Sequence, residues 1–439
     1  MFAYYLNIAW RSLRRSSGLT ALMMLAIGFG VAASMTTYSV FRAVSGDPIP
    51  WKSSKLFVPS IDPWGPKFAG QNQGNPPDTL TYADAMALMR DQRAKLQSAM
   101  YRISPSVVPA REGQHPFYVN GHAVYSQFFP MLDVPFRYGS AWSAVDDERR
   151  TTVVVISGAL NQELFAGANS VGRTLNVNGK DYRVIGVLDD WNPQPVFYDV
   201  INTGGFTTNK DELFMPFETG IAMNVENHSN TNCIETSKEA GFAGLQHSSC
   251  AWVGFMAELD TADEVQAYEK YLDGYSREQQ GAGRFAWAPN NRLRSLPAWL
   301  DYEEVVPGDT VVSLMAALGL LAVCLVNTVG LMLAKFLRRS GEIGLRRALG
   351  APRGAIYQQC LIEAGVVGVG GGLLGVLLTA LGVFGVSLMF PKEIATLARL
   401  DISLLGLTIV TAVLATVLAG LYPTYRASRV QPALQLKSS

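Results

Sequence analysis

The sequence predicts an α-helical membrane protein with four transmembrane helices and a large mixed α and β domain inserted between the first and the second. Four stretches are almost free of charge, and each is long enough to cross about 30 Å of hydrocarbon at 1.5 Å per residue. The block between the first two, residues 42–309, is far more polar and is long enough to bury a core of its own.

The predicted domain boundaries follow these changes in composition. They place an N-terminal segment at 1–18, transmembrane helices at 19–41, 310–334, 361–390 and 402–422, the inserted domain at 42–309, connections at 335–360 and 391–401, and a tail at 423–439. The first stretch has an alternative interpretation as a signal peptide, because arginines precede it and small residues follow it. Its length favours an uncleaved anchor, since the apolar part of a signal peptide has only about 7 to 15 residues.

Charge predicts the orientation of the helices. The 36 basic and 36 acidic residues balance, so the total charge gives no indication of nucleic-acid binding. Basic residues are concentrated before the first helix, between the second and third, and after the fourth. These three segments lie on one side of a four-helix protein, so the positive-inside rule predicts that both termini are cytoplasmic and that the inserted domain is external.

Within the inserted domain, the clearest pattern is a strand, a helix and a hairpin. Val153–Ile156 is a short β-branched strand, and Ser157 is placed to cap a helix that runs to about Phe165. The next two apolar runs flank Asn178-Gly179, a dipeptide that favours tight hairpin turns. The pattern predicts a mixed α and β fold with antiparallel strands.

The segment from Asp190 to Cys250 is rich in Asn, Thr, Ser and Gly and is predicted to form long loops. The segment forms either solvated surface loops without a binding role or a contact surface for an external partner. Cys233 and Cys250 both lie in the external domain, where an oxidising compartment permits a disulfide; the alternative is two free thiols. A zinc site formed by these cysteines with His228 and His247 matches no standard spacing.

Several kinds of chemistry are excluded because their motifs are missing. No G-x-x-x-x-G-K-[ST] sequence occurs, so the chain is not expected to hydrolyse a nucleotide or to bind a cofactor. No H-E-x-x-H or G-x-S-x-G sequence occurs either, which argues against a metalloprotease and a serine hydrolase. Ionisable residues are rare inside the apolar stretches, which argues against an ion-driven transporter or a charge-lined channel.

Two features of the apolar stretches predict helix packing. Asn327 lies deep in the second stretch, and its amide is expected to find a partner on a neighbouring helix. The third stretch contains two pairs of glycines at the spacing that lets helices approach closely: Gly368 with Gly372, and Gly371 with Gly375. This stretch exceeds one straight crossing, so a kink, a tilt or an extension beyond the bilayer is expected.

The connection between the second and third stretches contains "EIGLRRALGA", residues 342–351. Leu345 and Leu349 lie one helical turn apart, Glu342 and Arg346 form a favourable i to i+4 pair, and Gly350 is placed to end the helix. A short basic helix with an apolar stripe has three uses. It anchors the topology, lies on lipid headgroups, or inserts into a groove of a soluble partner.

Several segments resemble FtsX/MacB-type ABC transporter permeases, in the order expected for that family. They are "NTVGLMLAKFLRRSGEIGLRRALGAPRGAIYQQCLIEAGVVGVGGGLLG", "FFPMLDVPFRYGSAW" followed by "VVVISGALNQELFAGANSVGRTLNVNGKDYRVIGV", and the closing "YPTYRASRVQPALQL". The sequence departs from the family pattern at Pro352, where a small polar residue is common.

The resemblance implies a permease of the bacterial inner membrane with a periplasmic core domain and a distal insertion at roughly 190–260. It implies two permease subunits, identical or paralogous, each served by a separate cytoplasmic ATPase that uses ATP and Mg. Residues 338–351 would be the coupling helix that docks on this ATPase, through Glu342, Ile343, Leu345, Arg346, Arg347 and Leu349.

Efflux with a periplasmic adaptor and an outer-membrane channel is the function that the resemblance favours. Related permeases extract lipoproteins or regulate cell-wall hydrolases, and a receptor or scaffold anchored by four helices is the competing class.

Overall fold

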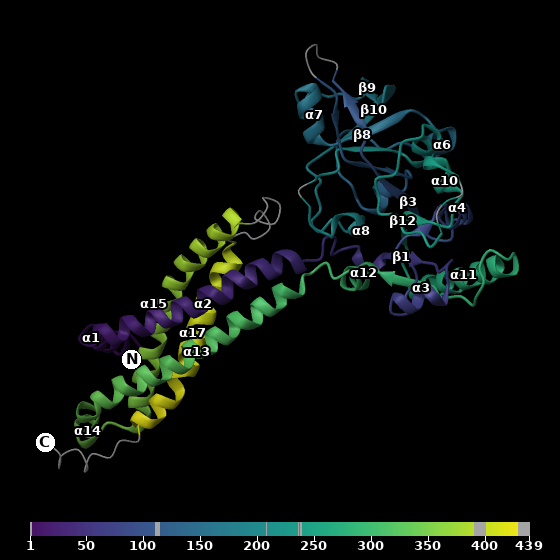
Figure 1. Ribbon diagram of the computed structural model, residues 1–439. Coiled ribbons are helices and arrows are strands. Elements are labelled where there is room, and N and C mark those ends of the chain that lie inside the picture. The colour runs from purple at the N-terminus through teal and green to yellow at the C-terminus, as the bar shows by residue number, and fades with distance from the viewer. Residues whose placement is uncertain are drawn as a thin grey trace. The chain divides into compact units, whose positions relative to one another are not determined.

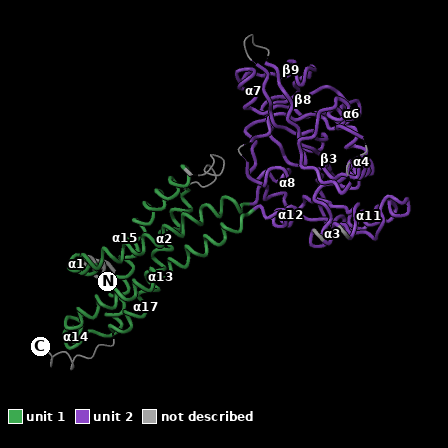
Figure 2. The backbone as a smooth tube through the Cα atoms, in the orientation of Figure 1, with its two compact units in different colours: residues 1–46, 306–439 green, residues 47–305 purple. Residues whose placement is uncertain are grey.

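A computed structural model describes residues 2–109, 115–207, 209–235, 237, 239–389 and 401–428 of the 439. The chain forms two compact units, shown in Figures 1 and 2: residues 1–46 with 306–439, and residues 47–305. We call them the helical unit and the strand-rich unit. The predicted external connection at 391–401 and the tail beyond residue 428 lie almost wholly outside the described residues.

The helical unit contains four helices that are long and apolar enough to cross a membrane. The described helices of this unit are α1 (Phe2–Arg15), α2 (Ser17–Ser45), α13 (Gly308–Arg338), α14 (Ser340–Ala348), α15 (Arg353–Met389) and α17 (Ile402–Ser428). The long helices extend beyond the apolar stretches at most of their ends, because hydropathy marks only the part suited to lipid while polar residues continue the same helix. The extra length of α15 lies at its start, which is eight residues before the predicted boundary at 361.

The glycines of α15 lie where two neighbouring helices approach. A Cβ added at Gly372 would lie 3.3 Å from Ala412 of α17, and one added at Gly371 would lie 3.0 Å from Ile27 of α2. Gly368 faces α17 and Gly375 faces α2 in the same way. The two glycine pairs therefore serve two different contacts, each of which brings a helix backbone close to α15.

Asn327 differs from the prediction. It lies on the exposed face of α13, and its amide has no hydrogen-bond partner on another helix of the described chain. The adjacent Thr328 is buried instead, and its hydroxyl donates to the carbonyl of Cys324 at 2.8 Å. The sequence located the polar position in the helix but could not show which side of the helix faces its neighbours.

The strand-rich unit is built on one large sheet (Figure 1). Its spatial order is β13-β1-β12-β3-β6-β11-β8-β10-β9-β4-β5, with β2 beside β12 and β7 beside β10. The pairs β8–β10 and β6–β11 are parallel, and the other described pairs are antiparallel. The strands are β1 (Leu56–Ser60), β2 (Leu80–Thr81), β3 (Leu96–Ile103), β4 (Ser106–Val108), β5 (Phe117–Tyr118), β6 (Gly121–Val124), β7 (Phe136–Gly139), β8 (Val153–Ile156), β9 (Thr174–Val177), β10 (Lys180–Leu188), β11 (Leu213–Pro216), β12 (Ala251–Glu258) and β13 (Arg292–Ser295).

The predicted strand, helix and hairpin are confirmed. Ser157 accepts a hydrogen bond from the amide of Leu160 at 3.0 Å and caps α7 (Gly158–Phe165). Asn178 and Gly179, with φ of 50° and 77°, form the turn between β9 and β10. The other described helices of the unit are α3 (Pro66–Gln71), α4 (Tyr82–Asp91), α5 (Phe128–Met131), α6 (Ala144–Arg149), α8 (Val200–Thr203), α9 (Phe217–Ala222), α10 (Gly241–Gln246), α11 (Ala262–Gly281) and α12 (Leu296–Tyr302), with a 3₁₀ turn at Ser53–Lys55.

Both faces of the sheet are covered by apolar cores. Val154 and Ile156 of β8 enter one core, whereas Val153 and Val155 enter the other, because successive side chains of a strand point to opposite faces. A strand that is buried on both faces has a continuous apolar sequence.

The segment predicted to be a separate loop-rich insertion, roughly 190–260, needs correction. Strands β11 and β12 fall within it, and both are interior strands of the sheet. The prediction failed because β11 has only four residues and stands between long polar loops. The segment therefore supplies part of the core as well as surface loops.

Cys233 and Cys250 form a disulfide in the strand-rich unit, at the start of β12. The zinc site considered from the sequence is excluded, since bonded cysteines cannot act as thiolate ligands. Among the described residues, no group of three or more His, Cys, Asp and Glu side chains could hold a metal ion.

Reduction of this disulfide is expected to lower the free energy of unfolding of the strand-rich unit by about 3 kcal/mol, because the bond closes a loop of 17 residues. Urea unfolding followed by tryptophan fluorescence, with and without dithiothreitol, measures the change. Alkylation without a reductant should leave Cys233 and Cys250 unlabelled; labelling of both would contradict the bond.

A charged cluster around His122 is buried in this unit. The two ring nitrogens of His122 on β6 lie 3.1 Å from a carboxylate oxygen of Asp199 and 3.0 Å from one of Asp211, and these three side chains are at most 7% exposed. Tyr198 donates its hydroxyl to Asp211 at 2.6 Å. Burial alone lowers the pKa of His122, but the two carboxylates outweigh it and raise this pKa to about 10. The imidazolium therefore stays charged at neutral pH.

Candidate functional site at the α14 end of the helical unit

Helix α14 stands between two of the long helices. Helix α13 ends at Arg338, and α14 begins at Ser340 after a break in the helix at Arg339. The short helix therefore contains fewer residues than the predicted range of 338–351. Gly350 adopts a φ of +96° just beyond α14, as expected for a glycine that ends a helix, and Pro352 precedes the first residue of α15. We call this region, with Ser12 of α1, the α14 end.

The apolar residues of α14 divide between two environments. Ile343 is buried in a cluster with Met332 and Ile356. Leu345 and Leu349 are 59% and 80% exposed. The helix is thus attached to its own chain by Ile343, while the leucine pair is left available to another molecule.

A buried ion pair lies beneath α14. Lys335 of α13 and Glu363 of α15 form a direct ion pair, and each side chain is 2% exposed. Ser12 of α1 donates its hydroxyl to Glu363 at 2.6 Å, and Arg339 donates to the other carboxylate oxygen at 3.1 Å. Glu363 is therefore held by three partners from separate elements, which compensates for its burial.

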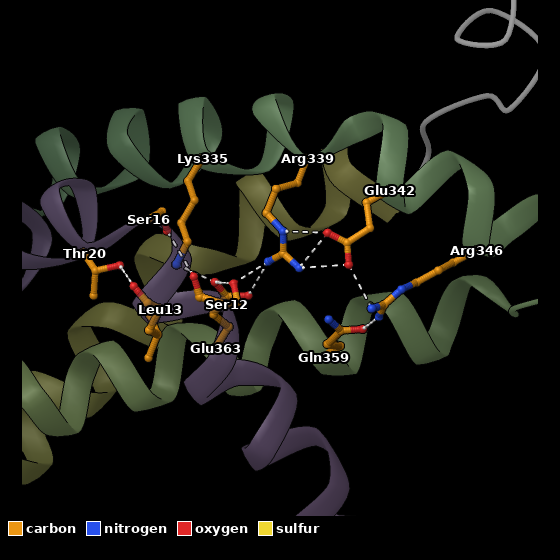
Figure 3. Close-up of polar contacts among 10 residues, drawn as sticks. All are labelled: Ser12, Leu13, Ser16, Thr20, Lys335, Arg339, Glu342, Arg346, Gln359 and Glu363. Atoms are coloured by element: carbon orange, nitrogen blue, oxygen red, sulfur yellow. Dashed lines mark hydrogen bonds and ion pairs between the residues drawn. The ribbon is translucent and has the colours of Figure 1, made fainter.

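Further contacts extend from this pair to α14 (Figure 3). The guanidinium of Arg339 also lies 3.4 Å from Glu342, and Glu342 accepts from Arg346 at 2.8 Å. Arg346 in turn donates to the side-chain oxygen of Gln359 on α15 at 3.0 Å. We call these side chains together the Glu363 network; its members are Ser12, Lys335, Arg339, Glu342, Arg346, Gln359 and Glu363.

The electrostatics of the network favour the ionised form of Glu342. Partial burial raises its pKa, but the hydrogen bond from Arg339 and the nearby positive charges outweigh this and lower the pKa below its ordinary value. Glu342 therefore remains an acceptor for two arginines at neutral pH.

The structure brings together only part of the predicted site. Glu342, Ile343 and Arg346 face the chain's own helices, Leu345 and Leu349 are exposed, and Arg347 is half-buried. Ser12, Lys335 and Gln359 were not among the predicted site residues. An opposite pair of charges at the facing ends of two apolar stretches, Lys335 and Glu363, was the signal that could have identified the network.

Comparison with protein families gives matches over most of the chain. Residues 20–274 match the MacB-like periplasmic core domain, and residues 314–432 match the FtsX-like permease C-terminal domain. The macrolide export ATP-binding/permease protein MacB of Salmonella paratyphi A is 24% identical over 438 residues, which cover 98% of this chain and 60% of that protein. MacB of Bdellovibrio bacteriovorus is 27% identical over 301 residues, covering 68% and 41%.

The chain thus spans about three fifths of the length of the Salmonella protein. Among solved structures, the periplasmic region of MacB from Actinobacillus actinomycetemcomitans matches with a TM-score of 0.37 and 16% identity, covering 57% of this chain and 94% of that one. The 439 residues include no ATPase domain. The chain belongs to the family of ABC permeases that combine a MacB-like periplasmic core domain with an FtsX-like C-terminal transmembrane domain.

Proposed function

We propose that this chain is the permease subunit of an ABC transporter in which a separate cytoplasmic ATPase drives movement of the strand-rich unit, and that the transporter acts in efflux. The ATPase binds and hydrolyses ATP with Mg. The permease supplies α14 as the docking helix and transmits the motion through its long helices.

The observation that carries this proposal is the contrast within α14. Leu345 and Leu349 are exposed. On the same helix, Glu342 pairs with Arg339, which follows the end of α13, and Arg346 donates to Gln359 of α15. A loosely held helix would absorb a push from a partner. A helix fixed by Ile343 and by the Glu363 network passes it to the long helices.

The orientation follows from charge. Basic residues are concentrated at the α14 end, which supports the proposal that this end faces the cytoplasm and that the strand-rich unit is periplasmic. The same side of the membrane is where an ATPase finds its nucleotide.

The assembly that we propose contains two permease subunits, identical or paralogous, together with the ATPase. The exposed apolar face of α13, which includes Met315 and Val326, faces lipid or the second permease subunit. A periplasmic adaptor and an outer-membrane channel complete the efflux path.

Replacing Leu345 with aspartate is expected to weaken binding of the ATPase roughly 30-fold or more, because a buried interface leucine would become a desolvated charge. The test co-expresses the full chain with an ABC ATPase encoded beside it and measures the ATPase that co-purifies. Loss of binding in Leu345→Asp and in Leu349→Asp supports docking through α14.

Val145→Asp is the matched control, since Val145 is 49% exposed on the strand-rich unit and undergoes the same change in charge. It should leave ATPase binding within twofold of the wild type. Undiminished binding in both leucine variants would contradict the docking role and favour a receptor or scaffold.

A further inference from the structure

A basic groove opens at the α14 end, between α1, the start of α2 and the end of α13. One acidic side chain, Glu342, lines it together with six basic ones: Arg11, Arg15, Lys335, Arg338, Arg339 and Arg346. The buried Glu363 adds a second carboxylate beneath the groove. Six cations against two carboxylates leave an excess of four positive charges.

The excess charge is carried by side chains that the fold does not neutralise. Arg11 and Arg338 are exposed and have no ion pair or hydrogen bond with any residue that the structure describes. Lys335 is only 2% exposed, and among the described residues it has one anionic partner, Glu363, for an ammonium with three donors. The groove is therefore lined by donors that an anion would satisfy.

The start of α2 adds to this potential. Ser16 stands at the N-cap but makes no side-chain cap, because its hydroxyl donates to the carbonyl of Ser12 at 3.3 Å. The first turn of α2 contains no acidic residue, and Ser17 and Gly18 line the groove. The uncapped amides of a 29-residue helix thus face the same space as the arginines, an arrangement that favours phosphate.

We propose that this groove binds the phosphodiester headgroup of an anionic membrane phospholipid. Phosphate chemistry explains the donors, and two further observations favour a lipid over a soluble phosphate. The groove lies where the apolar helices α2 and α13 reach their ends, the level at which headgroups lie. Ile8 and Leu19 also line it and offer contacts for the glycerol and the upper acyl chains.

The experiment titrates the detergent-purified full chain with phosphatidylglycerol, with phosphatidylcholine of the same acyl chains, and with inorganic phosphate, and counts bound molecules by native mass spectrometry. Phosphatidylglycerol should bind at least about tenfold more tightly than phosphatidylcholine. The double variant Arg11→Gln with Arg338→Gln should weaken phosphatidylglycerol roughly 10- to 30-fold.

The matched control is Arg353→Gln with Arg426→Gln, which removes two exposed arginines of the helical unit that do not line the groove. It should change affinity less than twofold, and an equal loss would overturn the site in favour of general electrostatic attraction. Both double variants must unfold at the wild-type temperature; if Arg11→Gln with Arg338→Gln does not, Arg15→Gln takes its place.

Two other outcomes overturn the proposal. Inorganic phosphate that binds as tightly as phosphatidylglycerol would assign the groove to a soluble anion. Lipid binding that is unchanged in the double variant, with loss of ATPase binding, would assign the groove to the partner protein.

Discussion

Replacement of Glu363 with glutamine is expected to destabilise the helical unit by about 3 to 5 kcal/mol. The change keeps the shape of the side chain but removes the negative charge that Lys335 and Arg339 share. Lys335 is only 2% exposed, so water cannot replace the lost partner. Thermal unfolding of the full chain in detergent, followed by circular dichroism, measures the loss.

Two comparisons separate a buried network from an ordinary ion pair. Asp401→Asn breaks the exposed pair with Arg42, whose side chains are 47% and 38% exposed, and should cost less than about 1 kcal/mol. Lys335→Met combined with Glu363→Met removes both buried charges and should cost less than Glu363→Gln alone. Wild-type stability in Glu363→Gln would show that the ion pair does not hold the helices together.

A second large loss is expected from His122→Gln in the strand-rich unit, about 3 to 5 kcal/mol. The imidazolium pairs with both Asp199 and Asp211, whereas Arg102 lies 3.6 Å from Asp199. A neutral side chain at position 122 therefore leaves two buried carboxylates beside each other without the cation that they share. Urea unfolding measures the loss. His247→Gln is the control, since His247 is 71% exposed and pairs with Glu239 at the surface.

The same cluster predicts how stability depends on pH. The pKa of His122 is raised from 6.5 to about 10, so its contribution is complete below pH 6.5 and is lost as the pH rises through about 10. Between these limits the wild type should lose up to about 1.4 kcal/mol per pH unit more than His122→Gln. Parallel pH profiles of the two proteins would show that His122 is neutral in the folded state.

The sequence predicted best where a local pattern determines the structure. Four apolar stretches became four long helices, and Asn178-Gly179 became a hairpin turn, because length and positive φ are properties of short segments. The leucine pair of α14 could also be predicted from the sequence, because the two residues lie one helical turn apart. These features need no knowledge of distant contacts.

What the sequence could not predict depends on which distant residues meet. Ser12 and Glu363 are 351 positions apart, and no sequence pattern around either residue predicts their contact. Strand β11 was hidden because only its neighbours β6 and β8 make its four residues interior. The prediction for Asn327 failed for the same reason, since a helix has several sides and only packing decides which one is covered.

The pairing of β1 with β13 has an architectural consequence. Phe57 lies opposite Ser295, so the chain enters and leaves the strand-rich unit on two neighbouring strands. A segment whose ends lie together can be excised, exchanged or inserted without pulling apart the helices that flank it in sequence. The strand-rich unit is in this sense a cassette, and chimaeras joined just before residue 47 and just after residue 305 are the natural way to move it between permeases.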